Sequence, residues 1–294
     1  TRAYAMESVA NLATEMSDRG GYDIRLEAAA AKEWNTFRGW EIVDETMQIR
    51  GGRGYETEHS LAARGEPKIP VERMMRDFRI NKIFEGSTEI MHLFMAREMV
   101  DKHLQVAGAV IDPEKPLSAK LAALPKLAAF YGWWYPSRWL GWGFWPRYSA
   151  FGPLATHLRF VERSSRRLAR ASFHGMLVYR ARLQNKQAFL FRLVDIANET
   201  FAMAASISRA QTLVDEAAPQ AAEAVRLADG FCLTARRRVR GLFRELWSND
   251  DAARYRLGLA VLDGRQRWLE TGVVAAPSRE RTPEAEKQPE PVGA

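Results

Sequence analysis

The sequence of 294 residues is 47% hydrophobic and 27% charged, with a formal net charge of +7 at neutral pH. This composition supports a sizeable core in one or two domains. One cysteine, Cys232, excludes an intrachain disulfide framework and a cysteine-based metal site, and it fits a reducing compartment. No apolar run approaches the roughly 20 residues that a bilayer-spanning helix needs, and no signal peptide opens the chain.

The positive excess is almost entirely arginine, and it has two interpretations. One is attraction to acidic ligands or to an anionic membrane, and the other is a solvated surface. We favour the solvated surface for the chain as a whole.

In the first third, apolar residues at helical spacing begin as early as Tyr4. Because Thr1 is not a methionine, we expect the chain to begin inside an element and to be a fragment of a longer protein. Glycines and prolines then separate the helical stretches. The pattern predicts helices over 1–18, 24–48, 71–80 and 87–106, with Gly51–Gly54 ending the second, a polar loop over 56–70 and a linker over 112–116.

The second half begins with an Ala/Leu-rich helix over 117–130 and a tryptophan-rich stretch over 130–153 that glycines and prolines break up. Long helices follow over 154–214, 219–247 and 251–272, and residues 276–294 read as a disordered tail. No segment alternates with period 2, so the chain is predicted to be all-α. We divide it into a helical bundle over 1–111, a second helical domain over 112–275 and the tail.

The segment around Glu85 carries the strongest chemical signal. Glu85 lies between the apolar pair Ile83-Phe84 and Gly86. Apolar walls raise the pKa of a carboxyl group by desolvation, which suits a general base near neutral pH, and a glycine lets a ligand approach closely. Ser87 and Thr88 offer hydroxyls and free N–H groups at a helix start, where pyrophosphate oxygens bind well. From these residues alone, a turn with a helix cap and no catalytic role is the favoured interpretation.

The stretch PVERMMRDFRINKIFEGSTEI is followed by LFMAREMVDKHL, and MQIRGGRGY lies about 30 residues upstream of IFEGSTEI. These two motifs resemble the C-terminal domain of the acyl-CoA dehydrogenase family. The resemblance covers Thr1 to about Val106, and the position of the extension after it is similar to that in very-long-chain members. An all-α bundle followed by an extra helical domain is the fold that it implies.

The resemblance also implies roles for individual residues. Glu85 matches the base that removes the substrate α-proton, and Gly86 matches a residue that contacts acyl-CoA. Ser87, Thr88 and Glu89 match positions near the flavin, although many members have Gln where Glu89 stands. The stretch that holds the adenine-dinucleotide part of FAD, across the dimer interface, is matched by Gln48, Ile49, Arg50, Gly51 and Gly52.

The implied parent enzyme is a homodimeric FAD-dependent dehydrogenase of fatty-acid β-oxidation. It converts acyl-CoA to trans-2-enoyl-CoA, passes electrons to an electron-transfer flavoprotein, and works in the bacterial cytoplasm or on the mitochondrial matrix side. Since most of the family's flavin pocket comes from upstream regions, we expect residues 1–294 alone to be inactive. The alternatives are a non-catalytic helical scaffold for dimerisation or membrane docking, and an acyl-CoA oxidase.

Beyond the motifs, the tryptophans of 130–153 suit a membrane interface, and arginines at helical spacing nearby suit acidic headgroups (Arg163, Arg166, Arg167 and Arg170). Aromatic packing in a core and solvated arginines are the other interpretation. The run 236–240 reads as a charged helix face without a nucleic-acid module. We expect Cys232 to be buried, and the five histidines show no ligand spacing, so no metal is predicted.

Overall fold

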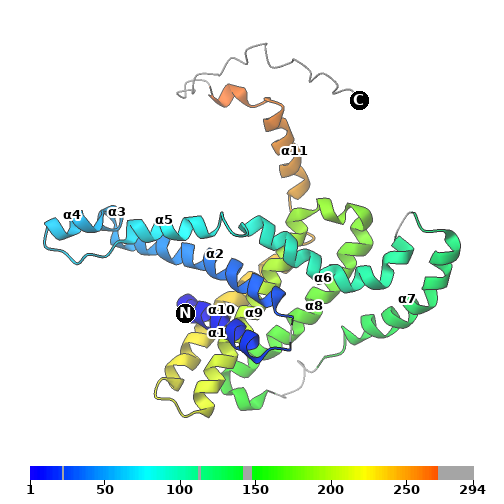
Figure 1. The fold of residues 1–294 in the computed structure, drawn as a ribbon, viewed down its shortest axis with the longest axis horizontal. Helices are drawn as coiled ribbons and strands as arrows, with labels where there is room; N and C mark the ends of the chain where they lie inside the picture. Colours follow the sequence, from blue (N-terminus) through cyan, green and yellow to red (C-terminus); the bar gives the residue numbers. More distant parts are fainter. Residues whose placement is uncertain (22, 112–113, 142–147, 271–294) are drawn as a thin grey trace, which may run out of the picture. The chain divides into compact units, whose positions relative to one another are not determined.

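The computed structural model describes residues 1–21, 23–111, 114–141 and 148–270 (Figure 1). Every regular element among them is helical, so the all-α prediction is confirmed for this part of the chain. The chain divides into two compact units, Thr1–Ser248 and Asn249–Ala294. The described helices of the first unit are α1 (Arg2–Arg19), α2 (Arg25–Arg50), α3 (Gly52–Tyr55), α4 (Glu58–Ala63), α5 (Val71–Asn81), α6 (Thr88–Ile111), α7 (Leu117–Ser137), α8 (Ala155–Tyr179), α9 (Gln187–Asp215) and α10 (Ala221–Glu245), with short 3-10 turns at Ser149–Leu154 and Arg180–Asn185.

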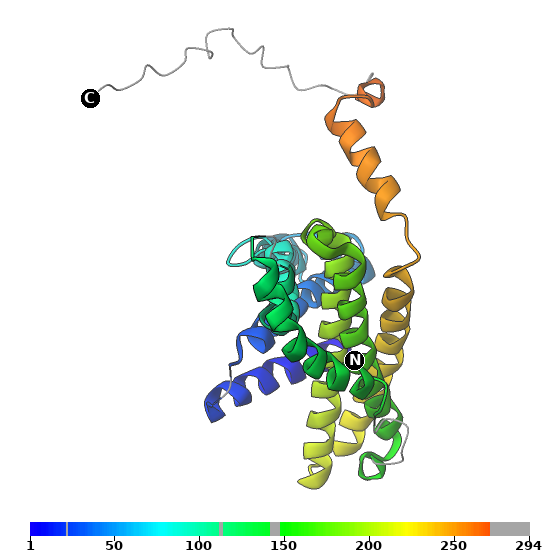
Figure 2. The same ribbon diagram turned by 90° about the vertical axis from the view of Figure 1, so that its right-hand side faces the viewer.

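Helix α9 lies at the centre of the first unit and packs against α1, α6, α8 and α10. It buries apolar residues nearly all round, which is the pattern of an internal helix. Helix α10 instead buries one stripe at spacings of three and four residues, including Ala228, Phe231 and Ala235. Figure 2 shows α8, α9 and α10 side by side, in agreement with their contacts.

Helices α2 and α5 form the second packed group, and α5 returns along α2 (Figure 1). Their close approach depends on Gly39 of α2, which is buried. A Cβ added there would lie 2.3 Å from Cε1 of Phe78 on α5. The pairs Arg79–Trp40 and Lys82–Phe37 place the end of α5 beside the middle of α2. The loop that follows α5 then contacts Lys32, nearer to the start of α2 than to its end at Arg50.

The core runs through both halves of the first unit. Trp34 of α2 packs edge-on against Phe231 of α10, with ring centroids 5.7 Å apart, and Met95 of α6 joins the same cluster. Residues on both sides of residue 111 share this core. Our division of the chain into two domains at that residue stays a prediction. In the second unit, α11 (Asp251–Leu262) has no buried residue, and a 3-10 turn follows at Arg267–Glu270.

Three predicted boundaries were wrong. The loop over 56–70 contains α4, because the Thr57 hydroxyl caps it by accepting from the Ser60 N–H and because Leu61 is fully buried. The helix predicted over 251–272 ends at Leu262. By contrast, the glycines after α2 end it as predicted, with Gly51 as its C-cap, and Gly52 then starts the short helix α3. The helix predicted over 117–130 continues to Ser137, with Gly132 and Pro136 inside it. Part of the linker over 112–116 and the tail over 276–294 lie outside the described residues.

Candidate active site

The loop between α5 and α6 carries Glu85 in a left-handed backbone conformation. Glu85 has φ 49° and Gly86 has φ 90°, a region that non-glycine residues adopt only at a cost. Gly86 also lies against Met91, because a Cβ there would be 2.6 Å from the Met91 Sδ. The loop is held inside by the Phe84 N–H bond to Ile80 O at 3.1 Å and the Thr88 N–H bond to Lys82 O at 3.2 Å. This geometry projects Glu85 from a tight, defined turn.

Glu85 is exposed, and so are its neighbours Ile83 and Phe84, at 52% and 44%. The prediction that this apolar pair encloses the carboxylate was wrong for the described residues. The pair and the carboxylate together form an accessible surface at the end of α5. Burial of Glu85 therefore has to come from a ligand or from a part of a longer protein.

The start of α6 differs partly from the expected anion site. The Ile90 N–H donates to the Ser87 hydroxyl at 3.4 Å, and the Thr88 N–H is already bonded within the loop. The first of these bonds caps the helix and the second closes the loop, so both N–H groups are already used. The Thr88 hydroxyl is buried without a hydrogen-bond partner, and Glu89 is exposed. At this helix start, the Thr88 hydroxyl is therefore a polar group that remains available to a ligand.

The second motif lies at the other end of α2. Gln48 and Ile49 are exposed, the latter at 86%, and Arg50 is half-buried. Gly51 has φ 58°, and a Cβ on Gly51 or Gly52 would meet no atom within 4 Å. Since Gly52 is the first residue of α3, its N–H is not used by that helix. The Gly51 N–H donates to Gln48 O at 3.2 Å, and the space beside both glycines is open for a ligand to approach the backbone.

The structure does not bring the two motifs together within one chain. Lys32, on α2, contacts the Glu85 loop, while Gly51 ends the same helix. Nineteen residues separate them, which is about 28 Å along a helix that rises 1.5 Å per residue. A single small ligand therefore cannot contact both motifs of the same chain.

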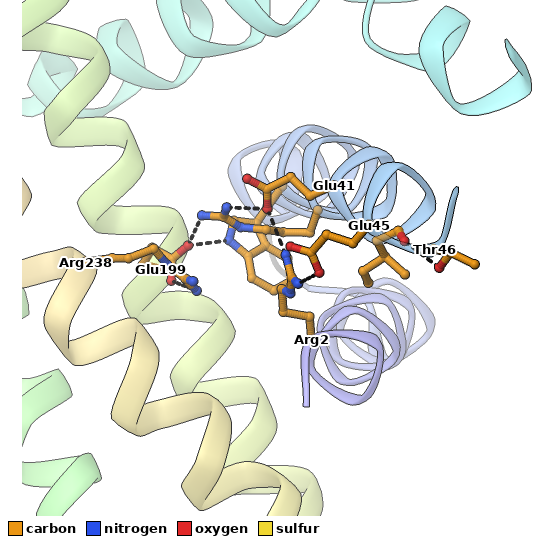
Figure 3. Close-up of polar contacts among 9 residues, drawn as sticks. Arg2, Glu41, Glu45, Thr46, Glu199 and Arg238 are labelled. Atoms are coloured by element: carbon orange, nitrogen blue, oxygen red, sulfur yellow. Dashed lines mark hydrogen bonds and ion pairs between the residues drawn. The ribbon is translucent and has the colours of Figure 1, made fainter. Parts of the chain in front are cut away.

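A buried ionic cluster that sequence reasoning missed lies behind this surface (Figure 3). The Glu199 carboxylate, 2% exposed, accepts from Trp34 Nε1 at 3.0 Å, from Arg238 Nη2 at 2.9 Å and from Arg38. Arg38 also donates to Glu41 at 2.8 Å. Figure 3 shows the chain of pairs continuing to Arg2 at the start of α1. No local motif signals it, because its members come from four helices.

A cavity of about 520 Å³ adjoins this cluster, between α2, α6, α9 and α10. On its wall His92 faces Asp195 Oδ1 at 2.9 Å and Thr88 O at 2.8 Å. Burial lowers the pKa of His92, but the Asp195 bond and the charge of Glu33, 3.8 Å away, outweigh it and raise the pKa. Burial also raises the pKa of Glu33. His92, Asp195 and Glu33 thus pair with one another, while the Thr88 hydroxyl on the same wall has no partner, and Glu85 is not part of the wall.

Several of the arginines singled out from the sequence contact other groups of the protein and are not simply solvated. Arg166 donates to Ser137 O at 2.6 Å, Arg170 bonds the carbonyl of Arg138, and Arg167 lies over the Phe243 ring at 4.2 Å. In the run 236–240, Arg238 pairs with buried Glu199, and Arg236 donates to His157 at 3.3 Å. The prediction of a plainly solvated face was therefore wrong for these two residues, while Arg237 and Arg240 are exposed.

The remaining predictions concern single residues. Cys232 is fully buried, and burial raises its pKa to about 12. Within the described ranges, no three His, Cys, Asp or Glu side chains are grouped as a metal site would require. In the same ranges, none of the helices is apolar over a stretch long enough to cross a membrane.

Comparison with known proteins finds a matching family model in each half of the chain. Residues 1–100 match the family described as "Acyl-CoA dehydrogenase, C-terminal domain", and residues 154–260 match "ACAD9/ACADV, C-terminal domain". The "Probable acyl-CoA dehydrogenase FadE10" of Mycobacterium tuberculosis is 50% identical over 92% of this chain and 42% of its own length. The human "Very long-chain specific acyl-CoA dehydrogenase, mitochondrial" is 30% identical over 81% of this chain and 34% of its own.

A solved structure shares the fold. An acyl-CoA dehydrogenase from Bacillus anthracis, crystallised with FAD, aligns with a TM-score of 0.59 and 22% identity over 87% of this chain and 42% of that one. The likeness extends to the helical fold, and residues 1–100 are the part of the chain that matches the acyl-CoA dehydrogenase C-terminal domain. The chain belongs to the acyl-CoA dehydrogenase family, and its second half is the ACAD9/ACADV type of extension. It spans about 42% of the mycobacterial relatives that it matches.

Proposed function

We propose that the chain is the C-terminal portion of an FAD-dependent acyl-CoA dehydrogenase of fatty-acid oxidation, in which Glu85 removes the α-proton of the acyl thioester. The observation that carries this proposal is the exposed Glu85 on a rigid left-handed turn, in a domain that matches this family. A carboxylate fixed in this way needs no conformational change to reach a substrate carbon. Gly86 leaves room beside it for the acyl-CoA chain.

FAD fits the residues that the chain presents. The buried, unpartnered Thr88 hydroxyl and the open backbone of Gly51 and Gly52 are groups that a nucleotide can satisfy. We assign Ser87, Thr88 and Glu89 to the flavin side, and Gln48, Ile49 and Arg50 with the two glycines to the adenine-dinucleotide side. Hydride acceptance from the substrate β-carbon is the chemistry that bound FAD supplies. Because the two motifs lie about 28 Å apart along α2, the glycine segment serves a second subunit, and we propose a homodimer.

The test of this function is the Glu85→Gln variant of the full-length enzyme, with Glu15→Gln, an exposed pair member on α1, as control. We expect flavin reduction by acyl-CoA to fall about 10²- to 10⁴-fold in Glu85→Gln, with FAD content unchanged, and to stay at the wild-type rate in the control. Stopped-flow flavin absorbance measures it. Wild-type reduction by Glu85→Gln would overturn the assignment of the base.

Residues 1–294 alone should be inactive, because the described residues leave Glu85 exposed. We propose that upstream parts of the enzyme complete the pocket. A purified chain of residues 1–294, mixed with FAD and passed over a desalting column, should retain no stoichiometric flavin. Tight flavin with turnover in that preparation would contradict this.

We further propose that an electron-transfer flavoprotein reoxidises the enzyme in the bacterial cytoplasm or on the mitochondrial matrix side. The full-length enzyme should reduce that acceptor without consuming oxygen when it turns over acyl-CoA. Oxygen consumption matched to turnover would instead assign an oxidase. An oxygen electrode beside an acceptor assay distinguishes the two.

The exposed apolar side of α7 supports peripheral membrane contact, which we also propose. Trp133 is 79% exposed and Trp139 is 56% exposed, and the helix leaves further large apolar side chains open to solvent (Leu117, Leu121, Leu124 and, just beyond it, Leu140). Trp134 instead is half-buried and packs against His103, with centroids 4.6 Å apart. Arg166 and Arg170 bond carbonyls at the end of α7, so they fix this helix rather than face headgroups.

The membrane proposal is tested by liposome sedimentation of the full-length protein. We expect Trp133→Ala with Trp139→Ala to lower binding several-fold, because both rings are apolar bodies with a polar edge that suit the interface. Trp268→Ala, which removes another exposed ring, is the matched control and should bind as wild type. Equal binding of the double variant and wild type would remove α7 from the proposal.

A further inference from the structure

Lys32 is placed under the loop that carries Glu85. It projects from α2, and its ammonium contacts three backbone carbonyls of the segment between α5 and α6. Nζ donates to Asn81 O at 2.9 Å, to Phe84 O at 3.4 Å and to Gly86 O. Asn81 is the last residue of α5, while Phe84 and Gly86 are the residues on either side of Glu85.

The chemistry of the contact matches a lysine. An ammonium has three donors and no acceptor, and here it meets three acceptors. Its positive charge also lies at the C-terminal end of α5, where the free carbonyls carry partial negative charge. Lys32 is half-buried and packed between α2 and this loop, so its bonds compete with water less than those of an exposed lysine.

The loop has a reason to need this support. Glu85 is in the left-handed region at φ 49°, and such residues persist only when the surroundings over-determine them. The neighbouring Gly86 adopts its φ of 90° without that cost. Through Phe84 O, Lys32 holds the peptide plane that precedes Glu85, and through Gly86 O it holds the plane that follows Gly86, so the two-residue turn is fixed at both ends. Releasing them lets Glu85 relax toward a right-handed conformation, and its carboxylate then points elsewhere.

We propose that Lys32 is a positioning residue, which holds the backbone of residues 81–86 so that Glu85 keeps the orientation for proton abstraction. It acts through the loop and does not touch the reacting atoms. The catalytic part of this proposal rests on the function proposed above. The structural part, that Lys32 holds the loop, stands on the three contacts alone.

The test uses the full-length holoenzyme with Lys32→Met, Lys32→Arg and the control Lys102→Met. Methionine keeps the length and helix preference of lysine but has no donor. Arginine keeps the charge and donates through a planar fork. Lys102 is exposed on α6 in the same unit. The readouts are amide hydrogen exchange over residues 81–88, FAD content, and kcat and KM for an acyl-CoA.

We expect exchange over residues 81–88 to be at least several-fold faster in Lys32→Met than in wild type or Lys102→Met. In the same variant kcat should fall about 10- to 100-fold, as a misplaced catalytic group requires, with KM and FAD content near wild type. Lys32→Arg should recover part of kcat. A merely structural lysine would instead lower FAD content and stability while leaving the kcat of the flavin-loaded fraction unchanged.

The outcomes that overturn the proposal are separate from failure of the proposed function. Unchanged exchange over 81–88 in Lys32→Met rejects the hold on the loop, whatever the activity. Faster exchange with unchanged kcat rejects the positioning role. If the wild-type enzyme reduces no flavin with acyl-CoA, or Glu85→Gln is fully active, the proposed function fails and the exchange result alone decides what Lys32 does. If Lys32→Met does not fold, Lys32→Arg is tested by the same measurements. Wild-type hydrogen exchange together with wild-type kcat in Lys32→Arg would then reject a positioning role that is specific to lysine.

Discussion

Single residues fix how the helices of this chain are held together. Glu199 is the clearest case, since its buried carboxylate accepts from Trp34 of α2, from Arg38 of α2 and from Arg238 of α10. A buried ion pair that loses one partner leaves the other charges uncompensated, which costs far more than the pair itself contributes. Partly buried Arg238 would then lose its anion partner, and Arg38 would be left with Glu41.

We therefore predict that Glu199→Gln lowers the free energy of unfolding by on the order of 3 kcal/mol. Urea unfolding of the chain, followed by circular dichroism, measures it. The matched control is Glu223→Gln, which removes an exposed partner of Arg226 on α10 and should change stability by less than about 1 kcal/mol. Equal effects of the two substitutions would show that the buried cluster does not hold the helices.

His92 makes the stability depend on pH. Both ring nitrogens face acceptors, Thr88 O and Asp195 Oδ1, which suits the charged imidazolium. Burial opposes that charge, but Asp195 and Glu33 outweigh it and the pKa lies above the ordinary 6.5. A raised pKa in the folded state gives stabilisation that is complete below 6.5 and is lost as the pH rises through the folded-state value.

The expected result is that His92→Gln loses more unfolding free energy at about pH 6 than at about pH 9. Urea unfolding of wild type and variant at both values measures the difference. Exposed His59 offers the control, because His59→Gln should show the same small effect at both pH values. A loss that is independent of pH in His92→Gln would mean that the ring is neutral in the folded protein.

At the scale of elements, glycines set how closely the helices approach. Gly39 lets α2 lie against Phe78 of α5, and Gly175 lets α8 lie against Phe189 of α9, where a Cβ would be 2.4 Å from the Phe189 ring. Gly175 lies inside α8 as a packing residue, and the stretch over 154–214 is interrupted at Arg180, which has φ 48°.

Replacing Gly39 by alanine should destabilise the chain by about 1–3 kcal/mol, because the added methyl overpacks the α2–α5 contact. Thermal unfolding measures this. Gly108→Ala on α6 is the control, since no atom lies within 4 Å of its Cβ, and alanine there should be neutral or stabilise by up to about 1 kcal/mol. Stabilisation by Gly39→Ala would show that Phe78 moves aside and that the contact is not tight.

At the scale of the whole molecule, the position of the two motifs at opposite ends of α2 leads to a test of assembly. In the proposed homodimer, each site takes Glu85 from one subunit and the glycine segment from the other. Gly52→Glu places a carboxylate against the dinucleotide phosphates, and its side chain meets no atom within 4 Å at Cβ, so the fold accommodates it. We expect Glu85→Gln and Gly52→Glu enzymes to be inactive separately.

Co-expression of these two full-length variants should restore activity in the mixed dimers. One of the two sites then combines an intact Glu85 with an intact glycine segment, so a mixed dimer should have about half the wild-type activity per dimer. Affinity tags on each chain isolate the mixed species for the assay. Inactive mixed dimers would mean that Glu85 and Gly52 serve the same site within one chain, contrary to their separation of about 28 Å along α2.

The sequence by itself determined the helical class, most helix bounds and the segment around Glu85. These depend on apolar spacing, glycine and proline positions and a recognisable motif, all of which act over a few residues. Helix α5 at Val71–Asn81 and the start of α6 at Thr88 agree with the bounds predicted from the sequence to within one residue. The sequence did not predict the helix at Glu58–Ala63, since one buried leucine and a threonine cap leave a weak pattern.

Only the tertiary structure decided what surrounds Glu85 and what joins the two halves. Lys32 meets the Glu85 loop, and Arg38 and Arg238 meet Glu199, because α2 packs against α5 on one side and lies near α9 on the other. Such contacts join residues far apart in the chain, so no local spacing indicates them. The physical reason is that a charge is buried where folded helices provide its partner, and the choice of partner depends on how whole helices pack.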